Sequence, residues 1–177
     1  GQVFVLNPNG VLFGKGARVD TAGLVASTLG LSDADFLAGK LRFGADGKSG
    51  ASVVNQGLLS AHDGGYVALI GQQVRNDGVI SARLGTVALA AGNKLSLNFN
   101  GDTLVGVTLD EGALQALVAN GGAVRADGGL VLLTAKAADG LLNAMVNNSG
   151  EIRAQTVAER AGKIYLLADM HGGTAQV

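Results

Sequence analysis

The chain has no cysteine, no tryptophan, a single proline and few other aromatic side chains among its 177 residues. Without cysteine, neither disulfides nor thiolate metal sites can stabilise the fold. Two tyrosines and five phenylalanines offer few of the aromatic platforms that line small-ligand pockets, which argues against a ligand-binding role. The sequence also shows no signal peptide and no apolar run long enough to span a bilayer, so we expect no membrane insertion.

Charge is sparse and balanced. Thirteen basic and fourteen acidic side chains give a formal net charge of −1. A surface this close to neutral has no general attraction for nucleic acid or for acidic lipids. We therefore expect neither as a partner.

Glycine and apolar side chains make up much of the chain instead. There are 29 glycines, and 47% of the residues are apolar. Glycine and proline together stay below the share that is typical of disordered low-complexity chains. The composition therefore predicts a folded chain, and the length suits one domain spanning residues 1–177.

A short sequence motif built on Asn-x-Gly recurs along the chain. Each copy follows an apolar strand pattern, precedes a second one, and leads to a glycine that opens a third. The asparagines of the four clear copies are Asn55, Asn76, Asn120 and Asn148. Such a repeat of turns and strands is the signature of a solenoid.

The spacing of these asparagines predicts coils of about 22 residues. The first two lie 21 residues apart, whereas the second and third lie 44 apart. We therefore expect a degenerate copy between them, at Leu97-Asn98-Phe99-Asn100-Gly101. The longer interval before the last copy predicts extra residues in one coil, at 137–142.

Coils of this length, with short strands and no long helix, predict a parallel β-helix. Each corner asparagine would bond through its side-chain amide to the next coil while its backbone visits the left-handed region, and the glycine two residues later would allow a tight corner. The alternative is a set of ordinary Asn-Gly hairpins in an antiparallel protein. Hairpins give no reason for the whole strand pattern to recur, which favours the solenoid.

Two insertions are expected to interrupt the coils, at about residues 32–54 and 95–118. In the first, Ser32 as an N-cap and Gly39 as a terminator predict a short helix. A hairpin between Lys40–Phe43 and Ser52–Val54 would follow it.

The second insertion combines two patterns. Residues 95–97 and 103–108 predict strands of a small sheet outside the coils. Residues 110–118 place Leu114, Leu117 and Val118 on one face of a helix. We expect the phenylalanines to fill the core or to pin these insertions onto it.

The tetrapeptide Asn7-Pro8-Asn9-Gly10 lies between two apolar strand patterns. Asparagine suits the first position of a type I turn, proline the second and glycine the fourth. The motif therefore predicts the first corner of the solenoid.

The sequence gives little support for an enzymatic function. A polysaccharide-acting β-helix needs clustered carboxylates, or arginine and lysine groups, on one face. The aspartates that lie beside glycine are turn formers first: Asp46, Asp63, Asp77, Asp102, Asp127 and Asp139. Their spacing lacks the ligand pattern of a calcium loop, and the two histidines, His62 and His171, are far apart in sequence. We expect no catalysis, no metal and no cofactor.

Residues 1–14 read GQVFVLNPNGVLFG, and AGLVAST follows at 22–28. These residues resemble the haemagglutination-activity domain, which is the N-terminal secretion domain of two-partner-secretion exoproteins such as filamentous haemagglutinin. The resemblance continues through the Asn-x-Gly coils to Gly162-Lys163-Ile164. It implies an all-β fold, a right-handed parallel β-helix with short helical and extra-helical sheet insertions. Members of this family usually carry an N-terminal cap ahead of the first motif, so the resemblance implies a domain cut at its start.

The resemblance also implies a function. The domain would direct secretion and nucleate folding of a large bacterial exoprotein, and the POTRA domains of its outer-membrane transporter would recognise it in the periplasm. Its partners would be that transporter and the remainder of the exoprotein, which would be secreted or held at the cell surface. Residues 7–10 would be needed for secretion. The alternatives are an adhesive module that binds a ligand or glycan and, more remotely, a polysaccharide-acting enzyme.

Overall fold

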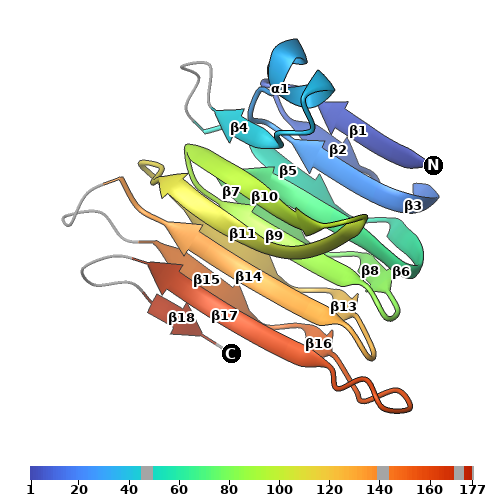
Figure 1. The fold of residues 1–177 in the computed structure, drawn as a ribbon. Coiled ribbons are helices and arrows are strands. Elements are labelled where there is room, and N and C mark those ends of the chain that lie inside the picture. The colour runs from blue at the N-terminus through green and yellow to red at the C-terminus, as the bar shows by residue number, and fades with distance from the viewer. Residues whose placement is uncertain (45–49, 139–143, 170–173, 177) are drawn as a thin grey trace.

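The computed structural model describes residues 1–44, 50–138, 144–169 and 174–176, and its strands stack coil upon coil (Figure 1). One six-stranded sheet forms the first face of the solenoid. Its strands are, in spatial order, β18 (Thr174–Gln176), β15 (Met145–Asn148), β12 (Leu117–Asn120), β7 (Gln73–Asn76), β5 (Ser52–Asn55) and β2 (Val11–Phe13). All its neighbouring strands are parallel, as expected for successive coils of one solenoid.

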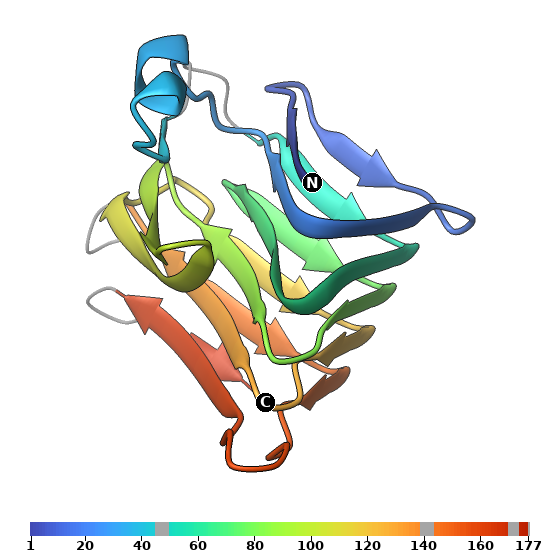
Figure 2. The ribbon, with the colours of Figure 1, turned by 45° about the vertical axis from the view of Figure 1, so that its right-hand side comes forward.

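A nine-stranded sheet forms the other two faces. Its strands are β1 (Gln2–Leu6), β3 (Arg18–Ser27), β6 (Leu58–Gly71), β8 (Val79–Ala82), β9 (Thr86–Ala91), β13 (Ala123–Arg125), β14 (Leu130–Lys136), β16 (Glu151–Arg153) and β17 (Lys163–Asp169). β3 and β6 contribute to both faces: residues 18–21 pair with 58–61 on the second face, and residues 23–27 pair with 66–70 on the third. Figure 2 shows the strands following one another down the stack. The predicted fold class, an all-β right-handed parallel β-helix, is confirmed.

The degenerate coil expected between Asn76 and Asn120 does not exist. β7 and β12 are directly paired, with Asn76 opposite Asn120. The additional residues leave the solenoid as an antiparallel hairpin of β10 (Lys94–Asn100) and β11 (Thr103–Glu111). Its connection, Gly101-Asp102, is a hairpin turn with Gly101 at φ +60°. The alternative interpretation, an ordinary Asn-Gly hairpin, is therefore correct at Asn100-Gly101, but it is not correct at the repeated Asn-x-Gly motifs.

The inner core consists of side chains that point into the coils at matching positions of successive strands. Val67, Val87 and Val131 are buried on the third face and stand opposite one another in the register. Ile80 and Val124 do the same on the second face. Stacking satisfies the backbone hydrogen bonds and buries apolar surface that one coil alone would expose.

A second core lies outside the third face. β4 (Arg42–Gly44), β10 and β11 form a three-stranded antiparallel sheet. Its inward side chains, Phe43, Leu95 and Leu104, pack on the outward side chains of β6 and β9, such as Ile70 and Ala88. β6 and β9 are therefore buried on both sides here, which explains why their sequences are continuously apolar rather than alternating.

Two of the expected local elements are wrong. β4 pairs with β10, whereas β5 is a solenoid strand that pairs with β2 and β7, so the hairpin of 40–43 with 52–54 does not form. Residues 110–118 are not helical: β11 extends to Glu111 and β12 begins at Leu117. The excess residues predicted at 137–142 lie mostly outside the described residues.

The first helical prediction is confirmed. α1 (Asp33–Leu37) has Ser32 as its N-cap, whose hydroxyl accepts a hydrogen bond from the Asp35 amide at 3.1 Å. Gly39 follows with φ +69°. In Figure 1, α1 lies at the same end of the stack as β1.

Tyr66 connects the third face to the outer sheet. Its ring lies over Gly23, where a Cβ atom would sit 2.5 Å from the Tyr66 Cζ. The side chain is 1% exposed and its hydroxyl has no hydrogen-bond partner. Burial, assisted by the charge of Asp102, raises the pKa of Tyr66 to about 12.

This raised pKa predicts a loss of stability at high pH. The unfolded chain ionises Tyr66 from about pH 10, whereas the folded chain retains the proton until about pH 12. The stabilisation is complete below pH 10 and is lost between these values, by on the order of 1–2 kcal/mol. In urea unfolding at pH 9 and pH 11.5, Tyr66→Phe should lose less stability than the wild type. Tyr165→Phe, at a 45% exposed side chain, should not differ from the wild type in this respect.

Candidate functional site

The Asn7-Pro8-Asn9-Gly10 motif forms a closed turn between β1 and β2. The Gly10 amide donates to the Asn7 carbonyl at 3.1 Å, and the Asn9 amide donates to the Asn7 Oδ1 at 3.0 Å. Gly10 has φ +128°, a conformation that L side chains rarely adopt. The turn is anchored to the next coil because the Asn7 amide donates to the Ser27 carbonyl at 2.9 Å. Asn7, Pro8 and Asn9 are exposed.

This motif lies at the corner where the chain passes from the third face to the first. The segment containing α1 and β4 leaves the solenoid at the equivalent corner one coil later, between β3 and β5. The β10–β11 hairpin leaves at that corner between β9 and β12. The predicted secretion motif and both described insertions therefore share one edge of the solenoid, which we call the insertion edge.

The four repeated asparagines form a ladder at the next corner, between the first and second faces. Each Nδ2 donates to the Oδ1 of the next coil: Asn55 to Asn76 at 2.8 Å, Asn76 to Asn120 at 2.8 Å, and Asn120 to Asn148 at 2.7 Å. All four residues are buried. The predicted amide contacts between coils are thus present, and the ladder satisfies polar groups that would otherwise be costly to bury.

The expected backbone conformation of these asparagines is wrong. Among the described non-glycine residues, positive φ occurs only at Leu84 and Ala158. The asparagines are the last residues of extended strands instead. The following glycines are needed because neighbouring coils approach too closely for a Cβ atom: at Gly78 it would lie 2.2 Å from the Gly57 carbonyl oxygen.

A second row of hydrogen-bonded polar groups lies along the insertion edge, and the sequence motifs did not predict it. The Gly50 amide donates to the Gln72 side chain at 2.8 Å, Gln72 donates to Asn93 at 3.0 Å, and Asn93 donates to Glu111 at 2.7 Å. Hydrogen bonds from Lys94 and Asn93 lower the pKa of the Glu111 carboxyl. One signal was available in the sequence, since Gln72 and Asn93 are separated by the same 21 residues as Asn55 and Asn76.

In the part of the chain that the structure describes, the acidic side chains do not converge on a catalytic centre; Asp46 and Asp139 lie outside that part. Asp63 pairs with Arg83, Asp77 with Arg75 at 2.9 Å, and Asp127 with Arg153 at 2.7 Å. Hydrogen bonds from the Gln155 amide and from Arg153 lower the pKa of Asp127. These carboxylates are therefore engaged in ion pairs along the corners.

The remaining candidates for metal or acid–base chemistry are also scattered. The Nε2 of His62 lies 3.3 Å from the Oδ1 of Asp20 at an exposed position. His171 lies outside the described residues. No group of three or more metal-ligating side chains occurs in the part of the chain that the structure describes. Within the same residues, no helix has the length and apolarity to cross a membrane.

Comparison with known proteins identifies close relatives of this architecture. Residues 1–177 match the family model of the TPS secretion domain. The chain is 37% identical over 178 residues to the heme/hemopexin-binding protein of Haemophilus influenzae, covering 96% of this chain and 19% of that protein. It thus spans about a fifth of the length of this curated relative. It also resembles the crystal structure of the HMW1 secretion domain from Haemophilus influenzae, with 33% identity and a TM-score of 0.85, covering 100% of this chain and 45% of that one.

Proposed function

This chain belongs to the TPS secretion domain family, and we propose that an outer-membrane two-partner-secretion transporter recognises it through POTRA domains and that it then nucleates folding of its exoprotein outside the cell. The family consists of secretion domains of exported proteins and is not an enzyme family. On this proposal the domain has no catalytic activity, and it reaches the transporter by way of the periplasm.

The exposed Asn7–Gly10 turn carries the recognition part of the proposal. Its proline and asparagine side chains lie at the surface, while its internal hydrogen bonds fix the backbone. The turn lies on the insertion edge, where α1 and the outer sheet add surface beyond the regular coils. Both of its internal hydrogen bonds lie within four residues, so the turn can form in a chain whose coils have not yet stacked, and exposed loop residues are usual carriers of recognition.

The register of the coils supports the nucleation part. β7 pairs with β5 on one side and β12 on the other, and the Asn ladder follows the same order. Each coil thus presents a complete row of backbone partners to the following one. A finished coil can template its neighbour, which favours growth in chain order as the polypeptide emerges.

Secretion of the exoprotein should fall when the turn is altered without unfolding the domain. Asn7→Ala removes the hydrogen bond to the Asn9 amide, which at an exposed site should cost no more than about 1 kcal/mol of unfolding free energy. We expect Asn7→Ala and Asn9→Ala to lose most secretion while their circular dichroism spectra and urea midpoints stay close to wild type.

The matched control is Asn98→Ala, at an exposed asparagine on the outer sheet that donates to Thr108 at 2.8 Å. It should be secreted normally. Wild-type secretion of all three variants would reduce the turn to a structural corner. A direct binding measurement separates the two steps: purified POTRA domains should bind the urea-unfolded wild-type chain after rapid dilution and bind the Asn7→Ala chain more weakly.

A further inference from the structure

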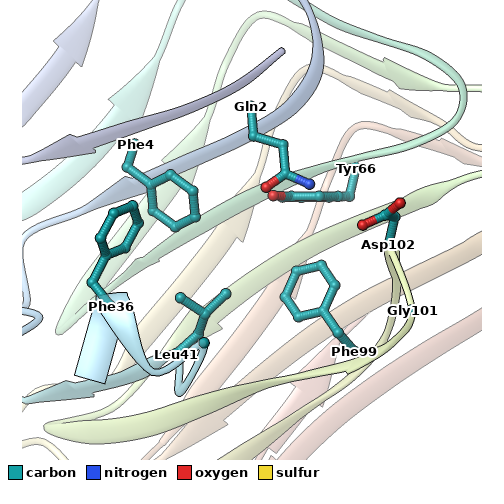
Figure 3. A pocket seen from close by; sticks show the side chains of 9 residues that line it. Gln2, Phe4, Phe36, Leu41, Tyr66, Phe99, Gly101 and Asp102 are labelled. Carbon is teal, nitrogen blue, oxygen red and sulfur yellow. The ribbon is translucent and has the colours of Figure 1, made fainter. Parts of the chain in front are cut away.

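A pocket of about 440 Å³ lies between β1, α1 and the tip of the β10–β11 hairpin (Figure 3). Its volume falls within the range of about 300–1,000 Å³ that is usual for small-ligand sites. Its main walls are Phe4, Phe36, Tyr66 and Phe99, with Asp102 and Gln2 at the rim. No lysine or arginine is among the described residues that line it.

Aromatic rings dominate the walls. Phe4 and Phe36 meet edge to face with their centroids 5.3 Å apart, and Tyr66 meets Phe99 in the same manner at 5.1 Å. Four of the seven aromatic residues of the chain thus face one cavity. The count of aromatic residues in the sequence does not reveal this cluster, because the fold brings the four rings together from four separate segments.

Two polar groups of the pocket lack partners. The Tyr66 hydroxyl is buried and makes no hydrogen bond. The Asp102 side chain is exposed and makes no hydrogen bond or ion pair to any residue that the structure describes, and its charge acts on Tyr66. In Figure 3 the hydroxyl end of Tyr66 lies beside the Gln2 side chain and points away from Asp102, whose carboxylate lies beyond the other end of the ring. The Tyr66 hydroxyl has no surface that a ligand could reach, so the accessible charged group of the pocket is the exposed Asp102 carboxylate.

These features select the charge of a ligand. The exposed Asp102 carboxylate at the rim repels an anion, and a purely apolar ligand gains no electrostatic attraction from it. An organic cation stacks favourably against aromatic faces and can donate N–H groups to a carboxylate. We propose that this pocket binds a guanidinium or ammonium group carried on a short apolar stem.

Two sources could supply that group, a free small molecule or a basic side chain of a polypeptide. The probes are therefore N-acetyl-arginine amide and the tripeptide acetyl-Ala-Arg-Ala-amide, titrated calorimetrically into the 177-residue chain. The citrulline analogue of each has nearly the same shape without the charge. We expect dissociation constants on the order of 1 mM for the arginine amide, which suits a small ligand in an open pocket.

The expected pattern is specific to the charge. The citrulline probes should bind about tenfold more weakly or not at all, and affinity for arginine should decrease as salt is added. Tighter binding of the tripeptide assigns the site to a polypeptide, whereas equal affinities assign it to the cationic group alone; either result supports the proposal. Equal binding of arginine and citrulline, or no binding of any probe at 20-fold the expected constant, overturns it.

Variants locate the site. Asp102→Asn keeps the shape of the side chain and should weaken arginine binding about tenfold. Tyr66→Phe keeps the ring and removes a hydroxyl that has no accessible surface, so it should bind arginine like wild type. Glu159→Gln makes the same change in net charge at an exposed turn between β16 and β17, away from the pocket, and should bind like wild type. Unchanged affinity in Asp102→Asn would overturn the assignment.

Discussion

Gly122→Ala is expected to destabilise the domain by about 4 kcal/mol or more, enough to prevent stable folding. A Cβ atom on Gly122 would lie 2.1 Å from the Gly78 carbonyl oxygen and 2.7 Å from the Asp77 carbonyl carbon. The obstacle is backbone of the adjacent coil, and that same Gly78 oxygen accepts the hydrogen bond of the Ala123 amide at 2.9 Å. The backbone cannot move aside without breaking the ladder between the two coils.

Gly121→Ala provides a matched control one residue away. The nearest atom to a Cβ at Gly121 is a side-chain oxygen of Asp77, at 3.0 Å, which can rotate away. We expect it to change the urea midpoint only slightly, because its clash involves a flexible group. Both variants are compared by urea unfolding monitored by circular dichroism. Equal midpoints for the two variants would show that the close approach of the coils is not what requires glycine here.

The second large effect is expected from Asn120→Ala, within the asparagine ladder. Asn120 is 1% exposed, accepts from the Asn76 Nδ2 at 2.8 Å, and donates to the Asn148 Oδ1 at 2.7 Å. Alanine removes both contacts, together with the 3.2 Å hydrogen bond from the Asn120 Nδ2 to the Glu151 carbonyl, and the Oδ1 of Asn148 loses its donor. Two disrupted buried hydrogen bonds should cost about 3 kcal/mol, whereas exposed Asn98→Ala should cost no more than about 1 kcal/mol.

Asn120→Asp tests which side chain donates and which accepts at each step of the asparagine ladder. An ionised aspartate can still accept from Asn76, but it places a carboxylate oxygen against the Oδ1 of Asn148. Burial and this second acceptor should raise the pKa of the new carboxyl, because only the protonated form can donate to Asn148. The variant should therefore gain stability relative to wild type as the pH falls from 7 to 5. A wild-type-like Asn120→Asp at pH 7 would contradict the arrangement.

The repeated Asn-x-Gly motif shows which features of the fold a short segment of sequence can determine. A strand pattern ending in asparagine, with glycine two residues later, encodes which side chains point inward and where the chain turns. The same is true of the Asn7–Gly10 turn and of Ser32 at the start of α1, because hydrogen bonds within four residues determine both. These features could be predicted because the interactions that form them are contained in short segments.

Pairing between distant segments could not be predicted in the same way. Residues 110–118 have an apolar spacing that fits a helix, yet Leu117 and Val118 belong to a strand because β7 and β15 offer parallel partners on both sides. Short apolar runs do not distinguish helix from strand by periodicity. Likewise, the 44 residues between two asparagines are compatible with two coils or with one coil and an excursion, and only the pairing of β4, β10 and β11 decides between them.

The sequence by itself determined that the chain is a parallel solenoid, that its asparagines bond across coils, and that its opening residues carry the motif of a secretion domain. Only the tertiary structure decided that the insertions leave at the same edge as that motif and that the glycine after each repeated asparagine serves close stacking of the coils. It also decided that Phe4, Phe36, Tyr66 and Phe99 surround one pocket. The physical reason is that a repeat encodes the geometry of one coil. The distance between coils, and the place of segments outside them, depend on contacts between residues far apart in the chain.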